Sequence, residues 1–232
     1  MRQVESSKII LLSNNFRINS RHIKLVIGDH DRKKTEQFQE VHTIEKILIR
    51  NDFVKRTFNN DIALIKLKRE IVFNDFVRPV CLPTRDRSYN GQNTTVVGWG
   101  KQSEGGLPAD VLMEVLVPVI TQKKCRRHTR YRASEITENM MCAGYDEGIL
   151  DACQGKITSS PLSYFTIQHS GDSGGPMIWR NDSDDPYTQI GIVSWGQGCA
   201  RKGYPGVYTR LGRYIDWIIE TVSSNDSCFC QK

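Results

Sequence analysis

The chain contains the stretch Gly171-Asp172-Ser173-Gly174-Gly175-Pro176, in which one serine stands among small residues. Small neighbours leave the Ser173 hydroxyl accessible and allow backbone amides to converge on one point beside it. An activated serine and its oxyanion hole require those two properties. The alternative interpretation is a glycine-rich turn in which Asp172 caps the serine. The stretch therefore predicts a nucleophilic serine, and a purely structural turn stays open.

The composition around this stretch is that of an ordinary globular protein. The chain has 232 residues, a formal net charge of +6, 38% hydrophobic residues and 25% charged residues, which excludes a wholly disordered chain. Its longest apolar runs, Ile9–Leu12 and 115–120, are too short to span a bilayer, and the N-terminal segment lacks the apolar core of a secretory signal. No basic motif is interleaved with aromatic residues, so we expect no nucleic-acid partner.

Short apolar and β-branched runs separated by Gly, Pro, Asn and Asp fill most of the chain. Runs of this length and spacing predict an antiparallel sandwich or barrel. The end of the chain is different, because apolar residues recur on one helical face over 214–222, and 121–132 is a candidate short surface helix. The predicted strands are 23–27, 44–49, 61–67, 94–97, 111–117, 191–195 and 206–208.

Other motifs accompany the serine. Asn60-Asp61-Ile62-Ala63-Leu64 places a carboxylate at the head of an apolar strand, where Asp61 either orients a histidine or caps the strand start. Two Trp-Gly turns follow, Val97-Gly98-Trp99-Gly100 and Ser194-Trp195-Gly196-Gln197-Gly198-Cys199. Pro205-Gly206-Val207-Tyr208-Thr209-Arg210 completes the series before the predicted helix.

In this order, over about residues 23–222, the motifs resemble those of the trypsin and chymotrypsin family of serine endopeptidases. The resemblance implies two perpendicular six-stranded antiparallel barrels, the first of them incomplete, with a C-terminal helix and an active site between the barrels. It implies that Asp61 is the catalytic aspartate and Ser173 the nucleophile. Asp172 then pairs with the new amino terminus of a cleaved zymogen, and the amides of Gly171 and Ser173 form the oxyanion hole.

The same resemblance implies a specificity pocket. Asp151 corresponds to the carboxylate at the pocket base, and Gly196 and Gly206 correspond to wall glycines that leave room for a long side chain. A buried carboxylate there pairs with a substrate cation, so cleavage after Arg or Lys is expected. Protein or peptide substrates and serpin-type inhibitors are the implied partners. The alternative for Asp151 is an ordinary loop carboxylate.

The chain has seven cysteines, an odd number. Their long spacings favour disulfides and an extracellular location over reduced cytosolic thiols. The resemblance implies the pairs Cys125–Cys142 and Cys153–Cys199. It also implies that Cys81 tethers the domain to another chain or segment, unless Cys228 or Cys230 is its partner.

The sequence departs from the family at its catalytic histidine. No Ala-Ala-His-Cys segment is present, and His22 lacks the flanking cysteine. Residues 1–22 are an atypical N-terminal segment without the family's activated amino terminus, and 223–232 form a polar tail. A triad without its base keeps only about 10³–10⁴ of rate enhancement over water. We therefore expect no measurable turnover; the alternative is a non-catalytic homologue that acts as a binding or regulatory module.

An insertion separates the pocket base from the nucleophile. The spacing from Asp151 to Ser173 is 16 residues longer than the resemblance implies, and removing 155–170 restores a continuous motif. Two hypotheses remain open for this segment: a retained intron that keeps the reading frame, and a genuine loop that blocks or regulates the cleft.

Two weaker signals concern ions. Asp29 and Glu36 resemble the ends of the family's calcium loop, which is about three residues shorter here, so they are candidate calcium ligands. A basic cluster surrounds Cys125, and it predicts either a polyanion-binding surface or an ordinary solvated helix. Its members are Lys123, Lys124, Arg126, Arg127, Arg130 and Arg132.

Overall fold

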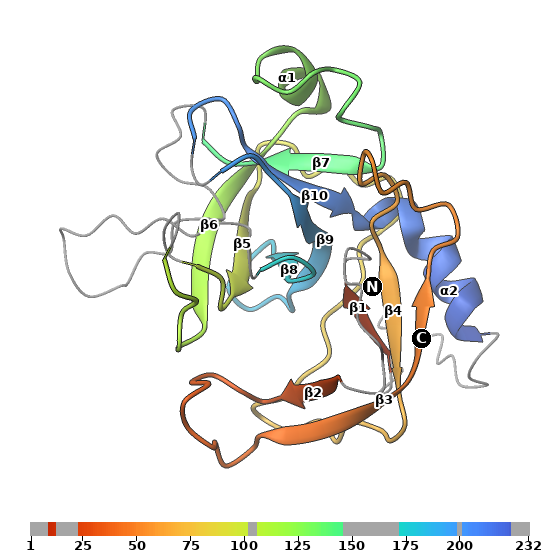
Figure 1. Ribbon diagram of the computed structural model, residues 1–232, viewed down its shortest axis with the longest axis vertical. Helices are drawn as coiled ribbons and strands as arrows, with labels where there is room; N and C mark the ends of the chain where they lie inside the picture. Colours follow the sequence, from red (N-terminus) through yellow and green to blue (C-terminus); the bar gives the residue numbers. More distant parts are fainter. Residues whose placement is uncertain (1–8, 13–22, 102–105, 146–171, 199–200, 224–232) are drawn as a thin grey trace.

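The computed structural model describes residues 9–12, 23–101, 106–145, 172–198 and 201–223, and two β units dominate them (Figure 1). Four strands form an open sheet early in the chain, and six later strands close into a barrel. A helix follows the last strand. The prediction of a mainly β fold with a C-terminal helix is confirmed. The first unit, however, is a four-stranded sheet in the described residues and is not a closed barrel.

The barrel has the strand order β10-β7-β6-β5-β8-β9, and the pairing of β9 with β10 closes it. Its interior holds buried apolar side chains such as Val117, Met177 and Tyr208. Strand β9 is buried on both faces, because Val193 belongs to the barrel core while the adjacent Ile192 packs in a second cluster outside it. The strands are β5 (Asn93–Gly98), β6 (Met113–Ile120), β7 (Met140–Ala143), β8 (Pro176–Trp179), β9 (Thr188–Trp195) and β10 (Gly206–Arg210).

The sheet has the order β1-β4-β3-β2, with antiparallel neighbours. Ile44, Ile65 and Leu67 are buried on its apolar face, whereas Leu25 and Ile27 at the β2 edge are only partly buried. The apolar side chains of this face are therefore fully buried at β3 and β4 and only partly buried toward β2. The strands are β1 (Ile9–Leu12), β2 (Lys24–Ile27), β3 (Glu40–Ile49) and β4 (Ala63–Leu67).

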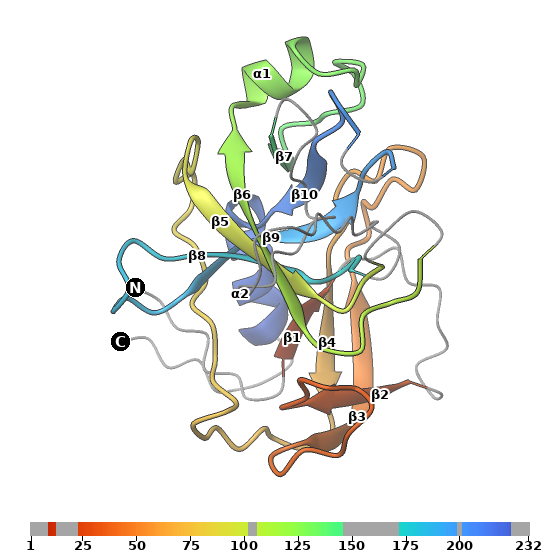
Figure 2. The same ribbon diagram turned by 90° about the vertical axis from the view of Figure 1, so that its left-hand side faces the viewer.

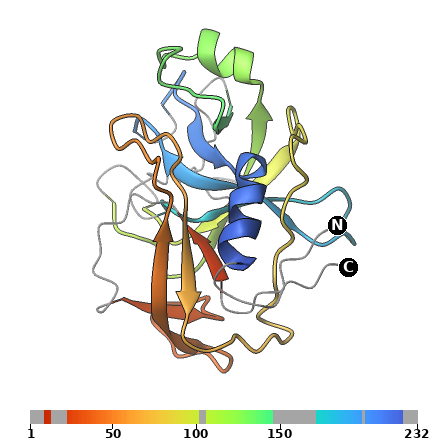
Figure 3. The same cartoon turned by 90° about the vertical axis from the view of Figure 1, so that its right-hand side faces the viewer.

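The C-terminal helix joins the two units. A 3-10 turn, η2 (Leu211–Tyr214), leads into α2 (Ile215–Ser223), and Ile218 of α2 is 1% exposed. The helix packs in one cluster with Leu64 of the sheet and Ile192 of the barrel. Figure 3 shows α2 running along the boundary between sheet and barrel. Burial of this apolar face against both units fixes their relative position.

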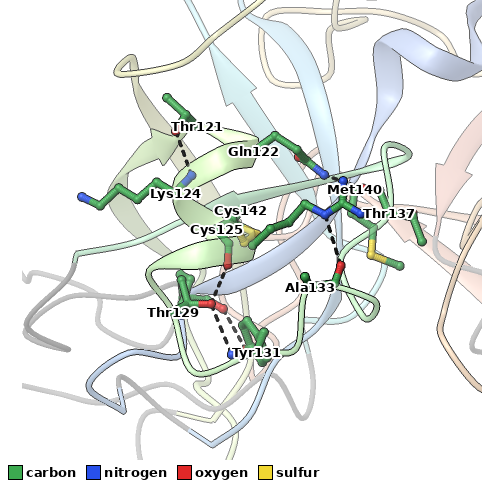
Figure 4. The surroundings of a disulfide bond; sticks show 12 residues. Thr121, Gln122, Lys124, Cys125, Thr129, Tyr131, Ala133, Thr137, Met140 and Cys142 are labelled. Carbon is green, nitrogen blue, oxygen red and sulfur yellow. Dashed lines mark hydrogen bonds between the residues drawn. A yellow bond between two sulfur atoms is a disulfide. The ribbon is translucent and has the colours of Figure 1, made fainter.

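A short helix packs on the outside of the barrel and is joined to it by a disulfide (Figure 4). Helix α1 (Gln122–Arg127) begins at Thr121, whose hydroxyl accepts a 3.1 Å hydrogen bond from the Lys124 amide. Cys125 on α1 and Cys142 on β7 form a disulfide, and both are buried. The helix is thereby attached covalently to the barrel wall, and its basic residues stand in its last turn, where they oppose the negative end of the helix dipole.

Three strands lie outside the predicted set, and the physical reasons differ. Strand β7 is built of Met, Met, Cys and Ala, which carry little β-propensity, and β8 begins with Pro176 directly after the glycine-rich turn. Strand β1 lies within the N-terminal segment that the motifs set apart, yet it lies beside β4 and pairs with it (Figure 2). Leu12 is the register partner of Ala63. Tertiary pairing therefore adds strands to the sheet and barrel that lie outside the predicted runs. Among the described residues, no helix has the length and hydrophobicity needed to cross a membrane.

Candidate active site

Asp61 lies where the sheet meets the barrel. It precedes β4 and is completely buried. Its carboxylate Oδ2 accepts a 2.5 Å hydrogen bond from the hydroxyl of Ser194 on β9, and its backbone carbonyl accepts a 2.7 Å bond from Thr209 on β10. A buried carboxylate is tolerable only when it is hydrogen-bonded. These two strands of the barrel therefore hold the aspartate that the sheet supplies.

Asn60 fixes the backbone beside this aspartate. Its φ of 60° lies in the left-handed region, which an asparagine tolerates better than most residues. Its side-chain oxygen accepts hydrogen bonds from Tyr214 Oη at 2.9 Å and Asn139 Nδ2 at 2.8 Å, and its Nδ2 donates to the Asp52 carbonyl at 3.0 Å. These bonds hold the Asn60–Asp61 segment in one conformation.

The turn that carries Ser173 is attached to the same strand of the barrel. Gly174 has a φ of +91°, donates its amide to the Val193 carbonyl at 2.9 Å, and is followed by Gly175, whose carbonyl accepts from the Val193 amide at 2.9 Å. Val193 immediately precedes Ser194 on β9. The Ser173 turn and the Asp61 carboxylate are thus bound to consecutive residues of one strand.

Asp172, beside Ser173, is 7% exposed, and a glycine turn surrounds its carboxylate. Oδ1 accepts a 2.6 Å hydrogen bond from the Gly100 amide. A Cβ added at Gly98 or Gly100 would overlap this carboxylate, so glycine is required at both positions. The first Trp-Gly turn therefore encloses the Asp172 carboxylate, and we call this turn the Asp172 seat. Sequence reasoning identified that turn as a motif but did not find this role.

Of the residues predicted to form the specificity pocket, only the two wall glycines, Gly196 and Gly206, lie in the described part of the chain. Gly206 opens β10, where its neighbour Val207 pairs with Trp195, and Gly196 follows Trp195 directly. The two glycines therefore lie at adjoining ends of β9 and β10. Asp151, Gly171 and the pair Cys153–Cys199 lie outside the described residues, as do the insertion 155–170, His22, and Cys228 and Cys230 of the tail.

Three histidines lie in the described residues: one in the loop after β2, one on β3 and one directly after α1. His42 on β3 is 0% exposed, and its Nε2 hydrogen-bonds to Glu40 Oε2 at 2.8 Å. His128 caps the end of α1, and the carbonyl of His30 accepts from the Trp99 indole at 3.0 Å. The imidazole of His42 is sealed from solvent and bound to Glu40, so a substrate cannot reach it.

The loop after β2 is held together by its own side chains. The Glu36 carboxylate accepts hydrogen bonds from the amides of His30 and Asp31, at 2.9 and 3.2 Å. Lys34 lies 2.7 Å from Asp31, and this contact lowers the pKa of the Asp31 carboxyl. Asp29 Oδ1 is buried without a hydrogen-bond partner. The described residues contain no cluster of three or more His, Cys, Asp or Glu side chains that would hold a metal.

Of the basic cluster around Cys125, Arg126 is partly neutralised, because its Nη1 lies 2.9 Å from Glu138 Oε1. The guanidinium of Arg130 lies over the Tyr204 ring at 6.0 Å. Lys123, Arg127 and Arg132 are exposed on the surface. The cluster is therefore a solvated face of α1 and the loop after it, with a net positive charge.

Comparison with known proteins agrees with this arrangement. The family model described as Trypsin matches residues 8–156 and 164–218. The chain is 40% identical over 200 residues to "Trypsin-1" from Astacus astacus, an alignment that covers 86% of this chain and 76% of that protein. It is 39% identical over 180 residues to "Venom protease" from Bombus pensylvanicus, covering 76% of this chain and 65% of that protein.

The matched ranges include Asp61, at the junction of sheet and barrel, and Ser173, in the turn that is hydrogen-bonded to β9. It starts at residue 8, ahead of the domain start predicted at residue 23, and its gap at 157–163 falls inside the insertion 155–170. Since the family model covers well over half of the chain and both relatives exceed a third identity, the chain belongs to the trypsin family of serine proteases.

Proposed function

We propose that this chain is a serine endopeptidase domain of trypsin-like specificity whose own turnover is very weak. The observation that carries the proposal is the shared anchor on β9: the Ser173 turn bonds to Val193, and Asp61 bonds to the next residue, Ser194. A hydroxyl and a buried carboxylate held by one rigid strand are suited to a single acyl-transfer site.

In this proposal Ser173 Oγ attacks the substrate carbonyl. The amides of Gly171 and Ser173 stabilise the oxyanion that develops, and Asp61 supplies the negative charge that would orient and stabilise a protonated base. The proton of Ser173 needs an acceptor in the transition state. Since the sequence lacks the Ala-Ala-His-Cys segment that carries the family's general base, the hydroxyl is a poor nucleophile, and the residual acceleration is about 10³–10⁴ over water.

Specificity for Arg or Lys rests on Asp151 and on the two wall glycines. Gly196 and Gly206, at adjoining strand ends, leave space for a long side chain. A carboxylate at the base of that space pairs with the substrate cation, because either charge alone in a closed pocket is costly. The name "Trypsin-1" of one relative supports this choice.

The sheet, in this proposal, is the described part of a first barrel perpendicular to the second. The peptidase domain then reaches residue 222, and 155–170 is inserted in it. The start of the family match and the pairing of β1 with β4 favour extending the domain from residue 23 back to residue 8. The buried Cys125–Cys142 disulfide supports an extracellular protein, with proteins or peptides as substrates and serpin-type proteins as inhibitors.

A fluorophosphonate probe and a pair of amide substrates test the proposal. We expect slow labelling of Ser173 and no labelling of Ser173→Ala. Hydrolysis of an Arg-amide should be undetectable at ordinary enzyme concentration, and any hydrolysis that appears at high enzyme concentration should be faster for the Arg-amide than for a matched Phe-amide. Labelling elsewhere than Ser173, or a preference for the Phe-amide, would contradict it.

A second candidate is a non-catalytic homologue that binds proteins at the surface around Ser173. The observation that favours it is His42, which is fully buried and bound to Glu40. Folded protein that is not labelled at all, yet binds an Arg-containing peptide more tightly than its Gln analogue, would support this candidate over the enzyme.

A further inference from the structure

A small cavity of about 60 Å³ lies at one end of the barrel. Its floor is made by barrel-core residues such as Met141 of β7 and Ile190 near the start of β9. The Ser173 turn bonds to Val193, near the other end of the same strand. A water molecule needs about 10–15 Å³ of such volume, so the cavity has room for several waters or for one small ion.

Three arginines line this cavity: Arg87, Arg210 and Arg213. Arg210, at the end of β10, donates through Nε and Nη2 to the Met140 carbonyl at 3.2 and 3.0 Å, and Nη2 also donates to Gln122 Oε1 at 2.9 Å. These acceptors are neutral and hold the guanidinium in one orientation. The site is therefore preorganised, because its inner cation cannot swing away.

The two outer arginines are also held in place. The Arg87 guanidinium lies over the Trp179 ring at 4.5 Å and over the Tyr89 ring at 5.3 Å. Arg213 lies 3.4 Å from the Asp86 carboxylate, the one acidic side chain in the lining. Aromatic stacking positions Arg87 without neutralising it.

The positive charge of this cavity exceeds its negative charge. Within the described part of the chain, no carboxylate is hydrogen-bonded to Arg87 or Arg210, and the nearby Glu138 is engaged by Arg126. Burial lowers the pKa of Arg210, and the charge of Arg213 lowers it further. An arginine nevertheless keeps its proton at any physiological pH, so the half-buried cation remains charged.

We propose that this cavity binds a small oxyanion of the size of sulfate, free or as a sulfate ester of a larger molecule. Charge-assisted hydrogen bonds from a guanidinium group to an oxyanion are stronger than neutral ones. The Nε and Nη2 hydrogens of Arg210 are used on Met140 and Gln122, so its two Nη1 hydrogens are the ones that would donate to the anion. The apolar floor lowers the local dielectric constant and strengthens the attraction. Binding there does not require a working Ser173, since the cavity and the Ser173 turn use different ends of β9.

The position of α1 bears on the source of the anion. Gln122, which bonds to Arg210, is the first residue of α1, and the exposed Lys123 and Arg127 follow on the same helix. A sulfate ester on a polysaccharide would therefore place its neighbouring groups near further cations. A free sulfate ion would use the cavity alone.

Calorimetric titration with sodium sulfate at constant ionic strength tests the proposal, with sodium chloride as the blank because exposed charges are screened by any salt. We expect saturable binding of one sulfate, a loss of about tenfold or more in affinity for Arg210→Gln, and a smaller loss for Arg213→Gln. Arg78→Gln is the matched control, because Arg78 is an exposed arginine paired with Asp75 elsewhere on the surface. It should bind sulfate as the unaltered protein does.

Two outcomes would overturn the proposal: no saturable sulfate binding, or equal affinities in Arg210→Gln, Arg213→Gln and Arg78→Gln. Arg213→Gln keeps the test valid if Arg210→Gln fails to fold, because Arg213 is exposed. A sulfated polysaccharide and its desulfated form then identify the source. Tighter binding of the sulfated form that falls in Arg213→Gln supports an ester, whereas sulfate binding without that preference supports the free ion.

Discussion

The hydroxyl of Ser194 donates a 2.5 Å hydrogen bond to the carboxylate of Asp61 across 133 residues of sequence. Ser194 belongs to the barrel and Asp61 to the segment that leads into the sheet, so this bond crosses the junction between the two units. Both side chains are buried. The acidic residue of the candidate site is therefore oriented by the barrel, and its orientation depends on the two units being docked.

Replacing Ser194 with Ala should destabilise the protein by about 1.5–3 kcal/mol, because a hydrogen bond to a buried charged group is lost. Urea denaturation at pH 7 measures this change. Ser183→Ala is the matched control: Ser183 lies in an exposed loop, and its hydroxyl bonds to the exposed Asp184. We expect its free energy of unfolding to change by no more than about 0.5 kcal/mol. Equal effects of the two variants would contradict the importance of the Ser194–Asp61 bond.

Replacing Gly100 with Ala should destabilise the Asp172 seat. The new Cβ would overlap the Asp172 carboxylate, and overpacking of a closed site costs about 1–3 kcal/mol. Slower fluorophosphonate labelling of Ser173 should accompany the loss of stability, since Asp172 precedes the nucleophile. In Gly212→Ala the nearest atom to the new Cβ lies at 3.5 Å, an ordinary contact, so near-normal stability is expected. A stable Gly100→Ala variant that is labelled at the normal rate would show that the seat is not tight.

The buried phenol of Tyr214 should lower the free energy of unfolding at high pH. Burial raises the pKa of the Tyr214 phenol, and its hydroxyl donates to Asn60. The unfolded chain releases this proton near pH 10 while the folded chain retains it, so the folded state binds more protons and the free energy of unfolding falls as pH rises above about 10.

The expected slope from this one group is at most about 1.4 kcal/mol per pH unit. Tyr214→Phe should remove that part of the slope and cost about 1 kcal/mol at pH 7 through the lost hydrogen bond. Chemical denaturation at pH 7, 9, 10 and 11 gives both numbers. Tyr187→Phe, a partly exposed residue, serves as the control. An unchanged slope in Tyr214→Phe would refute the assignment.

The Cys125–Cys142 bond should stabilise the protein by about 3 kcal/mol, as expected for a loop of 17 residues. The paired change of Cys125 and Cys142 to Ala should lower the midpoint of urea denaturation accordingly. Cys81→Ala keeps this disulfide and alters another buried cysteine, so it separates the effect of the cross-link from that of a lost buried sulfur. If both changes cost the same, the bond contributes packing alone.

Much of the fold was predictable because its signals are local. Short apolar and β-branched runs between Gly, Pro, Asn and Asp residues predicted β2, β3, β4, β5, β6, β9 and β10, and the apolar face of 214–222 predicted α2. Strand β7 lacks such a pattern, because it has no β-branched residue, and its pairing with β6 and β10 decides its conformation. Strand β1 is apolar but lies in the N-terminal segment that matches none of the recognised motifs, and its pairing with β4 places it in the sheet.

The chemistry of this protein followed from its sequence wherever one short stretch contains the whole signal. Small residues around Ser173 and a carboxylate at the head of an apolar strand can be recognised without a structure. Only the tertiary structure decided that Ser194 bonds to Asp61, that Asp172 sits against Gly98 and Gly100, and that Arg87, Arg210 and Arg213 share one cavity. The physical reason is that each of these contacts joins segments far apart in the chain. Their meeting depends on barrel closure and on packing of the sheet against the barrel, which local sequence patterns do not encode.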